Sequence, residues 1–261
     1  MVENICSLGL SKWEIKEIIN AARTLKNLRQ AGAKLPKLQG KRGILKSKEE
    51  SLLKAIAEIS LDELGVKYST LNEDINYLPV LPSIDLIISL DKDTKLINDK
   101  KVIKLADCRL ARSVADIIVV IERFGTVPDI SIIGENEIID SLSSFGALLG
   151  FNIKAFSHNK LTEEFKEYVE GKFDNTQNWI EFLDDAYHVA RGSRVIYIDN
   201  LPDYKIPSDL AGYLAEDGII MSNKPEHATI SDSLLSKSVY SEQIANLFSV
   251  IQAITIVTIH Y

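Results

Sequence analysis

Short apolar runs alternate with amphipathic stretches along most of this 261-residue chain, and glycines often stand where one ends. In the second half, a strand pattern over 129–133 ends at Gly134 and a helical pattern over 138–149 ends at Gly150. Glycine is favoured after the last helical residue because it adopts the left-handed conformation without a steric penalty. Strands that alternate with helices form parallel sheets, because two parallel strands need a crossover between them. The sequence therefore predicts an α/β fold.

The same alternation occurs in both halves, and 261 residues exceed the usual size of a single core. We expect helices over 10–28, 47–64, 113–124, 138–149, 179–190 and 241–258, and strands over 42–46, 84–90, 102–105, 129–133, 152–156, 194–198 and 218–221. Ser11 is the expected N-cap of the first helix, and Ser47 with Glu50 forms a capping-box pattern for the second. The expected architecture is two doubly wound parallel-sheet domains. One comprises residues 1–112 with a C-terminal helix over 241–261, residues 113–125 form a linker helix, and residues 126–240 form the second domain.

The composition is that of an ordinary soluble protein, with 46% hydrophobic and 26% charged residues. A formal charge of −7 argues against general nucleic-acid binding, although a basic stretch over 34–48 leaves a phosphate patch as an alternative to a solvated loop. No uninterrupted apolar run approaches the length of a membrane span, and the N-terminus has no signal-peptide pattern. Two distant cysteines, Cys6 and Cys108, favour a reducing cytoplasm.

No metal or cofactor is expected. The four histidines, His158, His188, His227 and His260, do not have the spacing of a zinc site or a catalytic triad. A glycine follows the expected strand over 129–133, but the three-glycine fingerprint of a dinucleotide site is absent.

Several short strings, in their order and spacing, resemble the aspartate/ornithine carbamoyltransferases. They lie at 10–26, 38–41, 115–117 with 122–125, 130–134 with 141–142, and 243–246 with Val250 and Ala253. The resemblance covers almost the whole chain and implies a two-domain fold whose last helix returns to the first domain. It also implies transfer of the carbamoyl group of carbamoyl phosphate to an amino group. That chemistry needs cationic donors for the phosphate, polar groups on the carbamoyl oxygen and an acceptor pocket.

At the phosphate position, the family's Ser-Thr-Arg-Thr-Arg run corresponds to Glu50, Ser51, Leu52, Leu53 and Lys54. Only the hydroxyl of Ser51 and the charge of Lys54 match the donors that such a site needs. In the expected capping box, the carboxylate of Glu50 reaches back to Ser47 and repels a phosphate at the helix N-terminus. The resemblance therefore implies a degenerate phosphate site.

The carbamoyl position departs from the family as well. Leu90 stands where the family has an arginine, and the stretch from Arg109 to Arg112 replaces its His-Pro-x-Gln motif. Arg109 and Arg112 could bind an anion, but arginines in the first turn of a helix are more often solvated.

The acceptor motif, His-Pro-Leu-Pro or His-Cys-Leu-Pro in the family, corresponds to Ser222, Asn223, Lys224 and Pro225, which keep only the proline. Glu226 follows, where the family often has an arginine. Asp199 resembles the aspartate of the ornithine-type enzymes, although a lone aspartate at a strand end is usually structural. The loop after Tyr68 is shorter than in the family and contains no lysine up to Pro82.

Three interpretations follow. The leading one is a carbamoyltransferase-like pseudoenzyme that acts by association or by binding a small anion or amino acid. Family members are trimers, so a homo-oligomer, or a hetero-oligomer with an active carbamoyltransferase, is the expected assembly. The second is an active transferase with a non-standard site, in which Lys46, Lys48 and Lys54 join Arg109 and Arg112 around another anion while Ser222 and Asn223 donate hydrogen bonds. The third is a sensor of an amino acid or nucleotide in an interdomain cleft.

Overall fold

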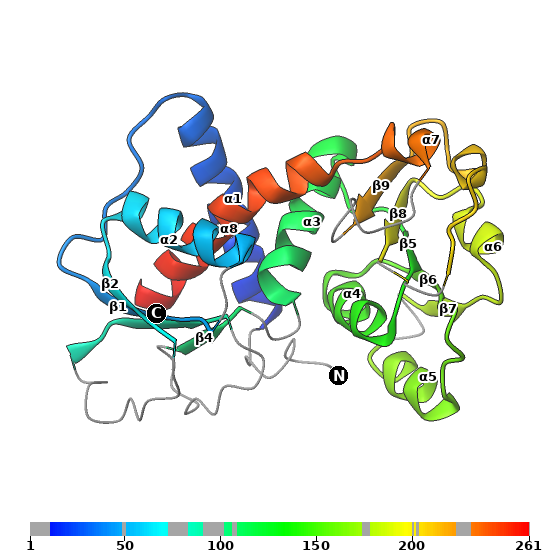
Figure 1. Cartoon of the computed structure of the whole chain (residues 1–261), viewed down its shortest axis with the longest axis horizontal. Coiled ribbons are helices and arrows are strands. Elements are labelled where there is room, and N and C mark those ends of the chain that lie inside the picture. Colours follow the sequence, from blue (N-terminus) through cyan, green and yellow to red (C-terminus); the bar gives the residue numbers. More distant parts are fainter. Residues whose placement is uncertain are drawn as a thin grey trace. The chain divides into compact units, whose positions relative to one another are not determined.

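The protein is described by a computed structural model that covers residues 11–48, 51–72, 83–90, 102–105, 109–173, 178–199, 201, 204–222 and 231–260. It contains two parallel sheets flanked by helices (Figure 1). One sheet has four strands in the order β2-β1-β3-β4, and the other has five in the order β7-β6-β5-β8-β9. Every strand pair is parallel. The predicted α/β class with two parallel sheets is confirmed.

The chain divides into two compact units. Among the described residues, the amino-terminal unit runs up to Ala115 and resumes at Ala245, and the middle unit runs from Asp116 to Ile244. Two helices pass from one unit to the other, α3 (Leu110–Phe124) and α8 (Tyr240–His260). The finer division predicted from the sequence, with a separate linker over 113–125, stays a prediction.

The amino-terminal unit contains the four-stranded sheet. Its elements are α1 (Lys12–Gln30), β1 (Arg42–Lys46), α2 (Leu52–Leu64), β2 (Lys67–Leu71), β3 (Leu86–Ser89) and β4 (Val102–Lys104). Helix α1 starts where the sequence predicts, because Ser11 accepts a hydrogen bond from the N–H of Glu14 while the Glu14 carboxylate accepts from the N–H of Ser11. Strand β2 is absent from the predicted elements, because a half-exposed edge strand lacks the apolar run by which buried strands are recognised.

The middle unit contains the five-stranded sheet. Its elements are β5 (Ile130–Ile133), α4 (Asn136–Leu149), β6 (Ile153–Phe156), α5 (Glu163–Glu170), β7 (Ile180–Phe182), α6 (Ala186–Ala190), β8 (Val195–Ile198), the 3-10 helix η4 (Leu210–Tyr213), β9 (Ile219–Ser222) and α7 (Asp232–Leu235). All four residues of the central strands β5 and β8 are buried, as expected inside a parallel sheet, and so are those of the edge strand β9.

The helix predicted over 179–190 is wrong. Strand β7 occupies the first part of this range, and the short helix α6 occupies the last. Asp185 divides them, because its side chain accepts a hydrogen bond from the N–H of His188 and so starts a new helix.

From the sequence we expect no apolar run as long as a membrane span, but helix α8 is long and largely apolar. By length and composition alone it is apolar enough to cross a membrane, although the core helix of a soluble protein has the same properties. Polar residues such as Gln252 and Thr255 interrupt its apolar residues, which is why no uninterrupted run marks it in the sequence. In the structure both are buried beside Val250, Ile251 and Ile254, as in a core helix.

Candidate functional site

The strand order of the amino-terminal unit identifies the edge at which a ligand is expected. From β1, the chain passes through α2 to β2 on one side, while β3 pairs with β1 on the other side. The strand order therefore reverses between β1 and β3. In open parallel sheets, ligands bind outside the carboxyl ends of the strands at such a switch point. The carboxyl ends of β1 and β3 are Lys46 and Ser89.

Both end residues are buried polar groups. Lys46 and Ser89 are partners in the strand register, and each has an exposed fraction of 0%. Ser47 follows Lys46 and is also buried. The main chain of this edge is fixed by hydrogen bonds from the N–H of Ser47 to the carbonyl of Leu71, 3.0 Å, and from the N–H of Leu90 to the carbonyl of Lys46, 2.9 Å.

Helix α2 begins just beyond this edge, and its N-cap is Ser51. The hydroxyl of Ser51 accepts from the N–H of Lys54 at 3.2 Å. The capping role expected of Ser47 is therefore wrong, because the main chain of Ser47 is still hydrogen-bonded to β2 and the helix starts at Leu52. Glu50 lies outside the described residues. The first turn of a helix exposes N–H groups without intrahelical partners, and these favour an anion.

Buried cations distinguish this unit. The buried charged residues that the structure describes there are Lys46, Lys54 and Arg109, which are all cationic. Arg109 precedes α3, follows β4 in the chain and has a left-handed backbone with φ of 52°. The expectation that Arg109 is solvated is wrong, because its exposed fraction is 9%. Arg112, one turn further along, is half-buried. Lys46 ends β1 and Lys54 lies in the first turn of α2, so two of these cations belong to the edge at which a ligand is expected.

The other positions of the predicted phosphate and carbamoyl sites are apolar. Leu52 is exposed, Leu53 is half-buried in the first turn of α2, and Leu90 is half-buried after β3. Leu90 has no side-chain hydrogen-bond donor for a carbamoyl oxygen.

The acceptor positions lie in the middle unit, where the strand order reverses between β5 and β8. Asp199 follows β8, and its N–H donates to the carbonyl of Ile133 at 2.9 Å. Gly134 follows β5, and a Cβ at that position would lie 3.2 Å from the Cβ of Asp199. The structure thus brings Gly134 and Asp199 together at the switch point. Asn223, Lys224, Pro225 and Glu226 lie outside the described residues.

Ser222, at the end of β9, is held by a residue that the sequence interpretation did not assign to any site. The side-chain oxygen of Gln243 accepts from the N–H of Ser222 at 3.2 Å, and its nitrogen donates to Asp116 at 2.7 Å. Gln243 therefore connects β9 to α3 within the middle unit. The hydroxyl of Ser222 is buried and has no hydrogen-bond partner among the described residues.

The histidines form no candidate centre in the described part of the chain. The ring of His158 stacks on that of Tyr204 with centroids 4.9 Å apart, and His188 lies 2.6 Å from the carboxylate of Asp185. Burial, followed by the charge of Asp185, raises the pKa of Tyr204. His227 is outside the described residues, and His260 ends α8. Within the described ranges, no three His, Cys, Asp or Glu side chains are grouped to hold a metal ion.

From the sequence, Ser89 is assigned to no site, and Lys46 is included only in the interpretation as an active transferase with a non-standard site. The signal for both is a polar residue that directly ends a buried apolar strand, as in Leu86–Ser89. Gln243 gives no comparable signal in the sequence, because its hydrogen-bond partners Ser222 and Asp116 are 21 and 127 positions away in the chain.

No family model matches the chain. Among curated proteins, it is 28% identical to ornithine carbamoyltransferase of Sulfolobus acidocaldarius over 134 residues, which are 44% of each chain, so this match spans less than half of that relative. It is 24% identical to ornithine carbamoyltransferase of Sulfurisphaera tokodaii over 261 aligned positions that cover 85% of each chain. Among solved structures, that of ornithine carbamoyltransferase from Gloeobacter violaceus has a TM-score of 0.78 at 17% identity, with 98% of each chain covered. By sequence likeness and by fold, therefore, the chain is ornithine carbamoyltransferase-like.

Proposed function

We propose that this protein binds a small anion of the phosphate class at the carboxyl ends of β1 and β3, and that it does not transfer a carbamoyl group. The observation that carries the proposal is the set of buried cations in the amino-terminal unit, Lys46, Lys54 and Arg109. Lys46 ends β1, and Lys54 lies in the first turn of α2, whose N-terminal N–H groups add partial positive charge. The relatives' names motivate carbamoyl phosphate as the first ligand to test.

The loss of transfer is inferred from the groups that would have to act on the carbamoyl oxygen. Catalysis of acyl transfer depends on preorganised donors aimed at the oxygen on which charge develops. Leu90 has no donor, and arginines at positions 109 and 112 replace the histidine and glutamine that the family resemblance implies. The proposed role is therefore binding, or association with an active carbamoyltransferase of arginine metabolism in the cytoplasm.

An active transferase with a non-standard site is the alternative. The burial of Arg109 favours it, because a buried guanidinium is a stronger donor to a developing oxyanion than a solvated one. Both proposals place an anion at the same site, but only the alternative predicts that the protein transfers a carbamoyl group.

Isothermal titration with carbamoyl phosphate tests the shared site. We expect Lys54→Met to weaken binding at least about tenfold, since a hydrogen bond to a charged group contributes about 1.5–3 kcal/mol. Lys16→Met is the matched control, because it removes one positive charge from an exposed position on α1 of the same unit. Far-UV circular dichroism establishes that both variants are folded. The anion site would be refuted if the wild-type protein did not bind carbamoyl phosphate at millimolar concentration. It would also be refuted if both variants bound carbamoyl phosphate equally weakly.

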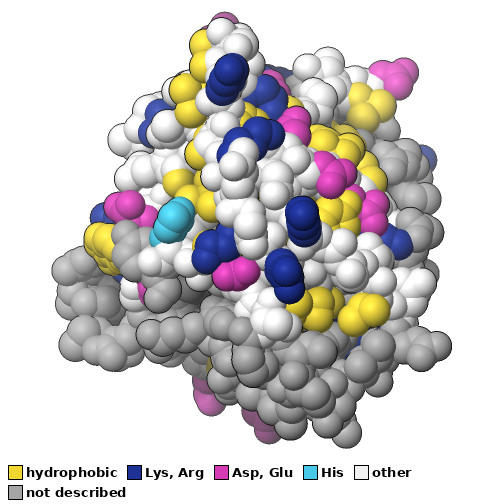
Figure 2. All heavy atoms as spheres, turned by 90° about the vertical axis from the view of Figure 1, so that its left-hand side faces the viewer, with side chains coloured by type: hydrophobic (Ala, Val, Ile, Leu, Met, Phe, Trp, Pro, Cys, Tyr) yellow, Lys and Arg dark blue, Asp and Glu magenta, His cyan; other side chains and the backbone are white. Residues whose placement is uncertain are grey.

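We also propose that copies of this chain associate through the exposed face of α2. Leu52 and Ile59 are 48% and 45% exposed, and they are seven positions apart in the chain, so they lie on one side of the helix. Ala55, between them on that side, is also exposed. Figure 2, which shows the face at the left-hand side of Figure 1, has hydrophobic side chains exposed among charged ones. Sedimentation equilibrium should show an oligomer that Ile59→Glu dissociates and Leu235→Glu, at a 42% exposed position in the middle unit, does not. A wild-type monomer would contradict this assembly.

A further inference from the structure

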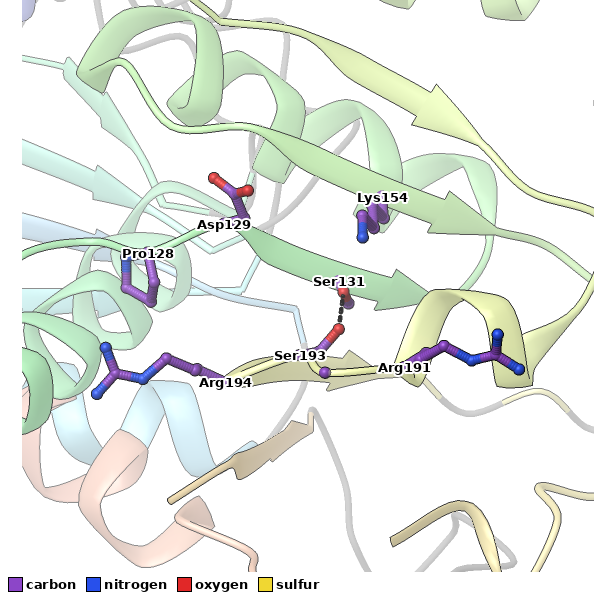
Figure 3. Close-up of a pocket in the computed structure, with 8 residues that line it drawn as sticks. Pro128, Asp129, Ser131, Lys154, Arg191, Ser193 and Arg194 are labelled. Carbon is purple, nitrogen blue, oxygen red and sulfur yellow. Dashed lines mark hydrogen bonds between the residues drawn. The ribbon is translucent and has the colours of Figure 1, made fainter. Parts of the chain in front are cut away.

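A second basic pocket lies in the middle unit, at the amino ends of its strands. It has a volume of about 200 Å³ and is lined by Pro128, Asp129, Ser131, Lys154, Arg191, Gly192, Ser193 and Arg194 (Figure 3). Pro128 and Asp129 precede β5, and the stretch from Arg191 to Arg194 precedes β8. The pocket is therefore at the opposite end of the strands from Gly134 and Asp199.

The pocket adjoins the end of the short helix α6. Helix α6 has five residues, and its buried residues pack with the carboxyl-terminal residues of the strands, such as Ile133 and Ile198. Nearer the amino ends, Ser131 of β5 is the register partner of Lys154 of β6. Register partners in a parallel sheet present their side chains on the same face. A serine and a lysine thus lie side by side on the face of the sheet that lines the pocket.

The serine hydroxyls of the pocket are already used as donors. Ser193 donates to the carbonyl of Val189 at 2.7 Å, so the 2.6 Å contact between the hydroxyls of Ser131 and Ser193 has Ser131 as its donor. Donors for a ligand therefore have to come from the cationic side chains.

The charges that line the pocket are three cations and one carboxylate. Arg194 is engaged, because its guanidinium donates to Asp217 and lies over the ring of Phe124 at 4.3 Å. Lys154 and Arg191 make no ion pair with any residue that the structure describes. Asp129 accepts a hydrogen bond from Asn152 at 3.0 Å, and Figure 3 shows its carboxylate pointing away from the Ser131–Ser193 pair. Positive charge therefore remains available here in a chain whose formal charge is −7.

We propose that this pocket binds a small oxyanion of the size of phosphate, with Lys154 and Arg191 as its charged donors. The volume is below the 300–1,000 Å³ typical of sites for drug-sized ligands, which restricts the occupant to a small ion or the anionic end of a larger molecule. Arginine and lysine are the usual partners of phosphate and carboxylate groups, arginine as a two-pronged donor and lysine as a point charge. The proposal is independent of the site in the amino-terminal unit, since it involves other residues in the other unit.

Backbone NMR of the full chain tests this proposal with inorganic phosphate and, in a separate titration, malonate as probes. We expect at least one probe to shift the amide signals of Ser131, Lys154 and Ser193 with saturation. Lys154→Met and Arg191→Met should each raise the dissociation constant for these shifts about tenfold or more. Lys160→Met is the matched control, because it removes one positive charge from an exposed loop position of the same unit. It should leave the dissociation constant unchanged.

The two probes distinguish the source of the oxyanion. Tighter binding of phosphate identifies a phosphoryl group, and tighter binding of malonate identifies a carboxylate. The proposal is overturned when neither probe shifts these signals, when sodium chloride at matched ionic strength shifts them equally, or when Lys160→Met weakens binding as much as the pocket variants. Shifts in the amino-terminal unit report the other site, so failure of one site is distinguishable from failure of the other.

Discussion

Lys46 and Ser89 lie next to each other in register at the carboxyl ends of β1 and β3, and both are fully buried. These are the two strands between which the order of the four-stranded sheet reverses. A lysine at such a point places positive charge where parallel sheets bind their ligands. The relationship supports the proposed anion site at this edge of the sheet.

Capping and anion binding are separable at Ser51. Ser51→Ala removes the cap of α2 and should lower the free energy of unfolding by about 0.5–2 kcal/mol. Ser51→Asp keeps a capping oxygen, so its stability should be close to that of the wild type, while its carboxylate repels an anion at the helix N-terminus. Chemical denaturation together with titration of carbamoyl phosphate checks both effects. Unchanged ligand affinity in Ser51→Asp would place the anion elsewhere.

Gln243 connects β9 and α3 through two buried hydrogen bonds. Gln243→Leu leaves the N–H of Ser222 without this acceptor and the buried carboxylate of Asp116 without this donor. We expect a loss of about 1–3 kcal/mol in the free energy of unfolding, measured by urea denaturation. Gln30→Leu, at the exposed end of α1, is the control. A loss as small as that of the control would mean that the bridge does not contribute to stability.

Gly134 leaves no room for a side chain at the switch point of the middle unit. A Cβ there would lie 2.3 Å from Cγ2 of Ile138, which is attached to a stiff branched carbon, and 3.2 Å from the Cβ of Asp199. Gly134→Ala should therefore destabilise the protein by about 1–3 kcal/mol. Gly212→Ala, whose Cβ would meet nothing within 4 Å, should change the thermal midpoint little. Equal midpoints for the two variants would show that this packing is not as tight as described.

The contact between Arg194 and Asp217 should be visible in the pKa of the Asp217 carboxyl group. The hydrogen bond from Arg194 holds the pKa of Asp217 below its ordinary value of 3.8. A carboxylate with a lowered folded-state pKa contributes stability that is present above the unfolded pKa and is lost as the pH falls through the folded pKa. NMR titration of the carboxyl carbon should give a midpoint below 3.8 that rises in Arg194→Met. A midpoint that is the same in both proteins would rule out the contact in solution.

The two parallel sheets are predictable from sequence because central strands such as β5 and β8 are largely apolar and are bounded by polar residues or glycine. Helix α1 is predictable for a local reason as well, since Ser11 and Glu14 form their capping box within four residues. The edge strands β2 and β7 are not predictable, because they are half-exposed and are defined by pairing with a neighbour rather than by their own pattern.

The candidate site is predictable only in part. Local alignment finds Ser51 and Lys54, but it does not show that Ser51 rather than Ser47 caps α2, because that depends on the hydrogen bond from Ser47 to β2. The burial of Lys46 and Arg109 depends on packing between distant segments, which charge and spacing do not encode. The hydrogen bonds of Gln243 to Ser222 and Asp116 cannot be predicted from the sequence for the same reason.

Carbamoyl phosphate binding and the formation of carbamoylated ornithine, measured in the same preparation, test the anion site and the loss of transfer together. We expect saturable binding that Lys54→Met weakens at least about tenfold, with no product above the uncatalysed rate. Product formation that depends on Lys54 would contradict the loss of transfer, and the absence of saturable binding would contradict the anion site.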